Sequence, residues 1–381
     1  MKKENSECTH IVFGFEHYNP LGIIRSLGEE GIRPIGIFVK NKLKLASKSK
    51  YLSKKYYVND IQEGYDLLFK IYDELANKDK VFLYTSDDQA TSFFDSHYNE
   101  LKGKFIFFNA GSKNGITKYM DKNNINQLAI ECGLNVAKTW VVKPGEIPKD
   151  IKYPIITKAI ISTIDNWKKD SFICNNEEEL KEAYKSIRSK KILLQQFINK
   201  KNELCIDGYS VNNGNDVFYA IASNYTYLLK EGYSYAMTVK NIDDEKLKKK
   251  LSLMFKKIKF EGIFSIEFLI DENDDLYFLE INFRNSTWSY ASTVAGMNLP
   301  VLWHQAMLDN SIVKKSYKKF EPFEAIVEFA DYRTRIKKKM IKFSDWRKEL
   351  SNAKCLYYYN KKDKKPFISQ IVYMVKGKII K

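Results

Sequence analysis

Cysteine, histidine and long apolar runs are scarce in this sequence. Its five cysteines are dispersed and include no C-x-x-C pair, which indicates reduced thiols and no cysteine-based metal site. The four histidines have no spacing typical of a catalytic triad. No window approaches the roughly 18 apolar residues of a membrane span, and no apolar segment follows the charged N-terminus. We therefore expect a soluble, cytoplasmic protein with no membrane partner.

Positive charge is abundant but evenly spread. The net charge of +16 comes almost entirely from lysine, since the chain has only seven arginines. Nucleic-acid binding would favour clustered arginines interleaved with aromatic residues, so we expect no nucleic-acid partner. The excess of positive charge suits an anionic ligand such as a nucleotide. With 381 residues, 44% of them apolar, the chain is long enough for two or three domains.

Strands and helices alternate in the first hundred residues. Short apolar runs predict strands at 10–14, 34–40 and 80–85, and helical spacing predicts helices over 21–31, 61–76 and 87–101. Further on we expect helices over 118–134, 177–190 and 245–259, strands at 153–160 and 192–198, and a hairpin pairing 204–211 with 216–223. The basic run 333–342 is interpreted as a solvated helix face. This order predicts an α/β protein that begins with a parallel sheet covered on both faces.

A second hairpin is predicted in SIEFLIDENDDLYFLEINFRNS, residues 265–286. If Asn273 and Asp274 form a two-residue turn, Glu267 lies directly across from Glu280 and Asn282 lies across from residue 265. Alternation then predicts one apolar face on each strand. The first strand would bury Phe264, Ile266, Phe268 and Ile270, and the second would bury Tyr277, Leu279, Ile281 and Phe283.

The opposed glutamates of this hairpin need neutralisation. Directly opposed side chains have Cβ atoms about 5 Å apart, and like charges there destabilise a sheet. Glu267, Glu280 and the Asn282 amide oxygen offer the hard oxygen ligands that Mg²⁺ prefers. Arg284, further along the strand, could bind a phosphate or carboxylate through two hydrogen bonds. The alternative is a solvated acidic face on an edge hairpin.

Two lysines and one strand end upstream have unusual positions. Lys158 lies on an otherwise apolar strand, where a buried charge needs an anionic partner. Lys122 begins a helix. The apolar strand that contains Gln195 and Gln196 ends in a polar turn before Glu203, so its free backbone suits an adenine edge and Glu203 suits ribose hydroxyls.

Taken in this order, the motifs resemble those of the ATP-grasp superfamily. The resemblance covers about 115–300 and includes MDK with a following GL, YPIITK, QQF with Glu203 seven residues after Gln196, and Glu267 followed by EINFR. It implies an ATP-grasp fold with a preceding α/β domain (1–114), an ATP-grasp domain (115–310, lid subdomain about 140–200) and a C-terminal α+β extension (311–381).

The resemblance also implies a set of roles. ATP phosphates would be bound by Lys122 and Lys158, and two Mg²⁺ (or Mn²⁺) ions by Glu267, Glu280 and Asn282. Arg284 would steady an acyl phosphate, with Lys158 also catalytic. The adenine would be flanked by Gln195, Gln196, Phe197 and Ile198, and the ribose held by Glu203.

The activity implied is that of a carboxylate–amine ligase acting on small molecules, amino acids among them, with a homodimer left open. Two alternatives remain: an ATP sensor without turnover, and a kinase acting on bicarbonate. The sensor is favoured by one departure, because the lid segment 159–170 has no glycine where the family pattern is glycine-rich. Ser162, Thr163 or Lys168 would have to replace its phosphate contacts. A second departure is Gln196, where the family carries a glutamate, and a third is Ser265, where D-alanine–D-alanine ligase carries an arginine.

Overall fold

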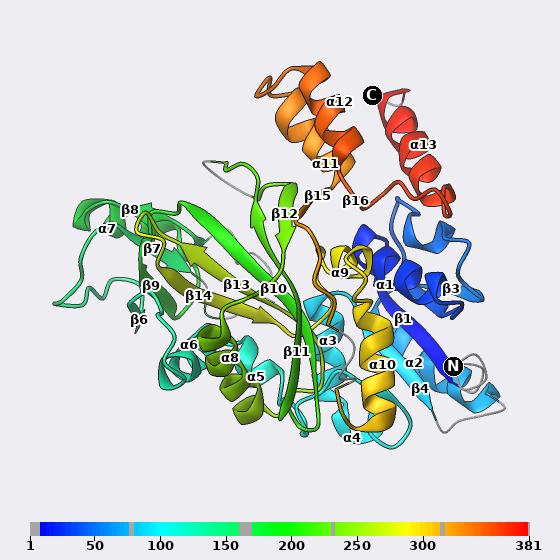
Figure 1. Ribbon diagram of the computed structural model, residues 1–381. Helices are drawn as coiled ribbons and strands as arrows, with labels where there is room; N and C mark the ends of the chain where they lie inside the picture. Colours follow the sequence, from blue (N-terminus) through cyan, green and yellow to red (C-terminus); the bar gives the residue numbers. More distant parts are fainter. Residues whose placement is uncertain are drawn as a thin grey trace.

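The computed structural model describes residues 8–75, 80–158, 160, 170–229, 233–312 and 317–379, with the backbone alone for 377–379. Its first layer is a parallel sheet of five strands in the order β3-β2-β1-β4-β5 (Figure 1). The strands are β1 (Thr9–Phe15), β2 (Ile35–Val39), β3 (Lys54–Val58), β4 (Val81–Thr85) and β5 (Ile106–Phe107). The associated helices are α1 (Tyr18–Glu29), η2 (Ala46–Lys48), α2 (Ile61–Glu74), α3 (Asp88–Ser96) and α4 (Tyr98–Leu101). The predicted parallel α/β start is confirmed.

Alternation along β1 directs side chains to the two faces of this sheet. Val12 belongs to the main core of the molecule, whereas Phe13 packs in a separate cluster with Phe94 of α3. Ring centroids of Phe13 and Phe94 are 5.0 Å apart. Because strand side chains alternate with a period of two, one sheet is buried on both sides, as a parallel sheet requires.

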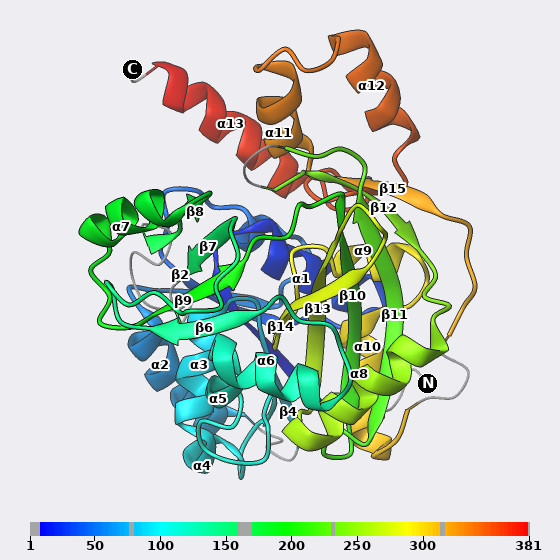
Figure 2. The same cartoon turned by 90° about the vertical axis from the view of Figure 1, so that its left-hand side faces the viewer.

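A small antiparallel sheet in the order β6-β9-β7-β8 follows, with its own core. It consists of β6 (Thr139–Val142), β7 (Ile155–Lys158), β8 (Ile173–Cys174) and β9 (Ile192–Gln196), with helix α7 (Glu177–Ser186). Two short helices, α5 (Thr117–Met120) and α6 (Lys122–Glu131), precede it. Figure 2 shows this unit to one side of the large sheet, where a lid subdomain was expected.

The largest sheet has seven strands in the order β14-β13-β10-β11-β12-β15-β16. They are β10 (Asn202–Val211), β11 (Asp216–Tyr225), β12 (Ala236–Lys240), β13 (Gly262–Ile270), β14 (Leu276–Asn282), β15 (Phe323–Ile326) and β16 (Cys355–Leu356). The helices of this part are α8 (Glu245–Ile258), α9 (Tyr290–Val294), α10 (Leu299–Asp309), α11 (Glu328–Asp331), η4 (Tyr332–Ile336), α12 (Phe343–Asn352) and α13 (Lys365–Ile379). The last segment of the chain thus adds two strands to this sheet. The domain boundaries at 114 and 310 stay a prediction.

Two helix predictions were wrong. The helix expected over 118–134 is split at Asp121, whose extended backbone and carboxylate cap α6 by accepting from the N–H groups of Asn123 (2.9 Å) and Asn124 (3.0 Å). The basic run 333–342 is not a solvated helix face throughout. Its first residues form a π-helix in which Arg335 is buried and paired with Asp331 at 2.8 Å.

The acidic hairpin pairs as predicted, but for a different reason. Glu267 lies opposite Glu280 and Ser265 opposite Asn282. The two-residue turn is wrong, because Ile270 pairs with Leu276 and leaves a five-residue loop. The register shifts at a bulge between Glu267 and Phe268, and this shift places Glu267 opposite Glu280.

The bulge also corrects the predicted apolar face of the second strand. Tyr277 and Leu279 are only half-buried, and Phe278 is buried opposite Phe268 instead. An extra residue in one strand reverses which side chains point to the core, so simple alternation fails beyond the bulge. Ile281 and Phe283, on the far side of the bulge, are buried as expected.

Candidate active site

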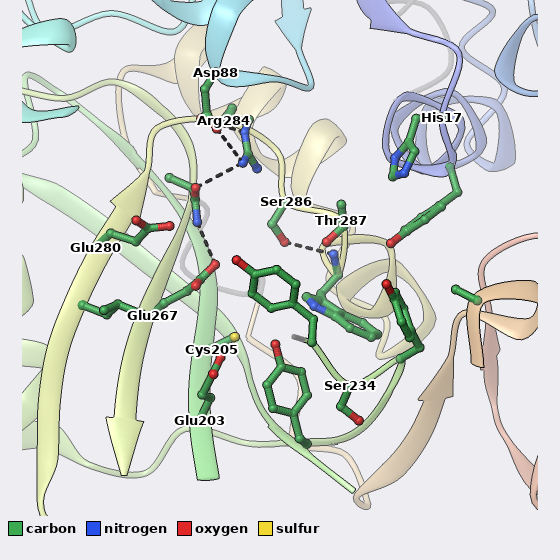
Figure 3. A pocket seen from close by; sticks show the side chains of 18 of the residues that line it. His17, Asp88, Glu203, Cys205, Ser234, Glu267, Glu280, Arg284, Ser286 and Thr287 are labelled. Carbon is green, nitrogen blue, oxygen red and sulfur yellow. Dashed lines mark hydrogen bonds and ion pairs between the residues drawn. The ribbon is translucent and has the colours of Figure 1, made fainter. Parts of the chain in front are cut away.

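One pocket of about 1160 Å³ gathers residues from all three sheets and from the C-terminal segment. The parallel-sheet part contributes the β1–α1 loop, and the small sheet contributes Lys158. The acidic hairpin contributes Glu267 and Glu280, and α13 contributes Tyr373. Figure 3 shows the two glutamates on one side of this pocket, His17 on the other, and Ser286 and Thr287 between them. The pocket therefore has a charged end and a second end built from distant segments.

The paired carboxylates form the core of the charged end. Glu267 is half-buried in the pocket wall, and desolvation, the charge of Glu280 and then that of Glu203 raise its pKa well above the usual range of a carboxyl group. No group of three or more His, Cys, Asp or Glu side chains suited to a metal is found within the described ranges. A divalent cation would fit the pair, because it would offset two opposed negative charges and take its other ligands from phosphate and water.

Asn282 is oriented differently from its expected role as a metal ligand. Its side-chain nitrogen donates to Glu267 Oε1 at 2.9 Å, while its oxygen accepts from Arg284 Nη2 at 3.1 Å. The amide oxygen therefore faces the guanidinium rather than the carboxylates. In this arrangement Asn282 holds Glu267 and Arg284 in place, and it would have to rotate to ligate a metal.

Arg284 already has a carboxylate partner. Its Nε and Nη2 donate to the two oxygens of Asp88 at 2.9 and 3.0 Å, a bidentate pair between the hairpin strand end and α3 (Figure 3). The guanidinium lines the pocket but is mostly covered. An anionic substrate would have to share Arg284 with Asp88 or displace it.

Both predicted phosphate-binding lysines line this pocket. Lys158 ends β7 and donates to Gln195 Oε1 at 2.7 Å. Burial and, to a smaller extent, the charge of Lys122 lower its pKa to about 8, while the carboxylates of Glu280 and Glu203 oppose the shift. A phosphate would restore the missing negative charge beside these two lysines.

The predicted adenine and ribose residues lie at the edge of this arrangement. Glu203 lines the pocket and pairs with Lys200 at 2.6 Å. The backbone N–H groups of Gln196 and Phe197 already donate to Lys138 and Pro154, so they are not free for adenine. Ile198 is buried, and Gln195 contacts the site through Lys158. The adenine position thus stays a prediction.

Asp207 supports the charged end from below. This fully buried residue of β10 accepts from the hydroxyls of Ser286 (2.7 Å) and Ser289 (2.8 Å), which fixes the loop after Arg284. Burial raises its pKa to about 6, although these hydroxyls oppose the shift. No motif marked Asp207 in the sequence, because its burial is a tertiary property.

Most residues of the second end were also missed. Trp288, Tyr235, Tyr358, Arg333 and Glu16 line it, and they come from five separate segments. The loops 17–22 and 285–290 both contribute side chains there. Asp87 caps α3 by accepting from the N–H of Ala90 at 2.8 Å. Ser162, Thr163 and Lys168 lie outside the described residues.

A parallel sheet, a small lid sheet and a large sheet carrying an acidic hairpin together define the ATP-grasp fold. Comparison with known proteins agrees, because residues 127–289 match the model of the ATP-grasp domain. The predicted resemblance of the motifs to the ATP-grasp superfamily is therefore confirmed over these residues.

Relatives support the same assignment. N5-carboxyaminoimidazole ribonucleotide synthase of Staphylococcus aureus (strain COL) is 28% identical over 131 residues, which cover 34% of each protein. The chain thus matches about a third of the length of these curated relatives. Within the described part of the chain, no helix is both long and apolar enough to cross a bilayer.

Solved structures share the fold over most of the chain. An L-amino acid ligase from Bacillus licheniformis has a TM-score of 0.65 at 13% identity, covering 84% of this chain and 80% of its own. N5-carboxyaminoimidazole synthetase of Staphylococcus aureus has a TM-score of 0.63 at 15% identity, covering 88% and 86%. At these identities the likeness concerns the fold alone.

Proposed function

We propose that this protein is an ATP-dependent carboxylate–amine ligase that forms an amide bond and releases ADP and phosphate. The observation that carries the proposal is the meeting of the Glu267–Glu280 pair with Lys122, Lys158 and Arg284 in one pocket. Opposed carboxylates beside half-buried cations suit a metal-bound polyphosphate. The names of the L-amino acid ligase and of the synthase relatives are consistent with ligase chemistry.

Nucleotide binding is assigned to the charged end. Lys158 and Lys122 would contact the phosphates, and phosphate contact would raise the lowered pKa of Lys158 and keep it charged. Glu203 would accept from ribose hydroxyls after exchanging its contact with Lys200. The adenine would lie near 195–198, although two backbone N–H groups of this segment are already used.

Glu267 and Glu280 would hold Mg²⁺ or Mn²⁺. A cation held there would supply positive charge to the phosphate oxygens as a carboxylate approaches them. Asn282 and Asp88 would keep Glu267 and Arg284 oriented, so that the site is organised before substrate binds.

The reaction has two steps. A substrate carboxylate oxygen attacks the γ-phosphorus of ATP, the bond to the β-phosphate oxygen breaks, and ADP leaves. The amine nitrogen of the second substrate then attacks the acyl carbon, phosphate leaves, and the nitrogen loses a proton. Arg284 would stabilise the negative charge of the acyl phosphate, and a closed pocket would protect it from water.

The proposal is tested by scoring ATP-dependent phosphate release with amino acids and small acids offered in pairs. A ligase should release phosphate only when an acid and an amine are both present, and mass spectrometry should find the amide. ADP release that does not depend on any added amine would contradict amide formation.

Bicarbonate is a second candidate acid. A neighbour with a TM-score of 0.61 is a biotin carboxylase domain solved with MgADP and bicarbonate, at 17% identity. ATP consumption with bicarbonate and no organic acid would favour this candidate. A pocket with so large an aromatic end favours an organic substrate instead. Nucleotide binding with no turnover under any condition would favour the ATP sensor.

A further inference from the structure

A guanidinium from the C-terminal segment reaches the second end of the pocket. Arg333 lines the pocket together with Ala330 and Tyr358, which come from the same segment. Ala330 is the residue before Asp331 in α11, and its small side chain leaves room there. Arg333 therefore faces the space that the phosphate-binding residues do not use.

The backbone that carries Arg333 is held firmly. Arg333 lies in the π-helix η4, and such helices are rare and frequent at functional sites. Two residues on, Arg335 is buried, donates to Asp331 and lies 4.6 Å from the ring of Tyr227. Asp331 also accepts from the indole of Trp346 at 2.8 Å. One arginine of this turn is thus an anchor, and the other is directed to the pocket.

Two carboxylates of this part of the molecule, Glu328 and Glu16, accept hydrogen bonds from backbone N–H groups. Among their oxygens, only Glu16 Oε1 is buried with no hydrogen-bond partner in the described part of the chain. Glu328 accepts from three successive backbone N–H groups, those of Tyr357 (3.0 Å), Tyr358 (3.0 Å) and Tyr359 (2.7 Å). Glu16 uses one oxygen for the N–H groups of Leu45 (2.7 Å) and Ser47 (3.2 Å). Over the described ranges, no hydrogen bond or ion pair to the Arg333 guanidinium is found.

Aromatic rings form the walls around this cation. Tyr18 lies 5.5 Å from Tyr358 between ring centroids, and Trp288 lies 5.4 Å from Tyr357. These rings offer flat apolar surface, and Tyr18 and Trp288 line the pocket. An apolar body with one negatively charged group matches this end better than a cationic amine, which Arg333 would repel.

We propose that Arg333 binds a non-reacting carboxylate of the amine substrate, so that the acceptor is an amino acid or peptide with a free α-carboxylate. The inference rests on the proposed ligase function. The reacting carboxylate must meet the phosphates at the Glu267–Glu280 end, so the anion bound by Arg333 is a different group. An acceptor held this way would direct its amine toward the acyl phosphate.

The test compares each acceptor with its own amide. L-Alanine and L-phenylalanine are offered beside L-alaninamide and L-phenylalaninamide, with ATP, Mg²⁺ and the acid found in the pairwise screen. The wild type should prefer the amino acids. In Arg333→Gln the KM for the amino acid should rise at least about tenfold, because a charge-assisted contact is lost. The KM for the amide should stay the same.

Two variants make the comparison specific. Arg333→Lys keeps the charge without the planar fork and should restore part of the preference. Arg347→Gln removes an exposed arginine of α12 that lines a different, apolar cleft, and it should behave like the wild type. Calorimetry of L-phenylalanine binding to the wild type and to Arg333→Gln gives a readout that does not depend on turnover.

Each outcome decides one question. Ligase turnover without any preference for the amino acid over its amide overturns the role of Arg333 and leaves the ligase function intact. A raised KM for the acid, with that of the amine unchanged, overturns the acceptor assignment. Binding of L-phenylalanine that is lost in Arg333→Gln supports the carboxylate site, even if no pair of substrates is joined and the ligase function fails.

Discussion

The two ends of the pocket are built in different ways. The charged end rests on Glu267, Glu280 and Arg284, which lie within one hairpin and the residues after it. The second end takes its lining from the β1–α1 loop, from the segment after β14 and from the C-terminal segment. A site made by neighbouring strands leaves a short pattern in the sequence, whereas a site made by distant segments leaves none. The charged end was accordingly predicted, and the aromatic end was not.

The largest effect should come from breaking the charged end. Glu280→Gln removes one charge from the opposed pair without changing the shape of the strand, so turnover should fall at least about a hundredfold. The far-ultraviolet circular dichroism spectrum should match that of the wild type. Glu272→Gln, in the exposed loop of the same hairpin, is the matched control. Normal turnover in Glu280→Gln would show that the pair is not part of the machinery.

The second-largest effect should come from Asp363, which joins the C-terminal segment to Arg25 of α1. Asp363 accepts from Arg25 Nε at 3.2 Å and from Ser49 Oγ at 2.8 Å, and the Arg25–Asp363 ion pair is fully buried. Asp363→Asn leaves the buried charge of Arg25 without its carboxylate partner, so the free energy of unfolding should fall by about 3–5 kcal/mol. The measurement is the urea midpoint, with the exposed Asp345→Asn of α12 as control.

If the two ends are independent, nucleotide affinity should survive in Asp363→Asn under conditions where the protein is folded. A nucleotide dissociation constant that rises together with the loss of stability would show that the ends are coupled.

Lys158→Ala should weaken ATP binding by an order of magnitude or more. The substitution removes a half-buried cation of the proposed phosphate site, and Gln195 loses its donor. Lys152→Ala removes an exposed lysine just before the same strand and should leave affinity unchanged. Equal dissociation constants in the two variants would remove Lys158 from the nucleotide site.

The pH dependence of metal binding should give the smallest of these effects. Burial and the charge of Glu280 raise the pKa of Glu267, so the protonated form persists toward neutral pH. A metal needs the ionised form, so Mg²⁺-ATP binding should release a proton. Affinity should then rise with pH by at most about tenfold per pH unit.

Calorimetry in buffers of different ionisation enthalpy measures this proton release. Glu267→Gln should abolish it. A proton count of zero in the wild type would mean that Glu267 is already ionised before the metal binds.

Much of the fold followed from local pattern. The alternation of strands and helices at the start of the chain and the pairing of Glu267 with Glu280 were both predicted correctly. The errors occurred where one residue changed the local geometry. Asp121 ended a helix early because its carboxylate satisfied N–H groups of the next one. A bulge exchanged Leu279 for Phe278 in the core, because strand faces alternate strictly with residue number.

The sequence by itself determined the ATP-grasp fold and the carboxylate pair, because strand periodicity, turn residues and motif spacing act over short distances along the chain. Only the tertiary structure decided that Asp88 pairs with Arg284, that Asp207 supports the loop and that Arg333 enters the pocket. These contacts join residues far apart in sequence. Their energies depend on burial and on the side chains that packing brings near, and neither is written in any local stretch of residues.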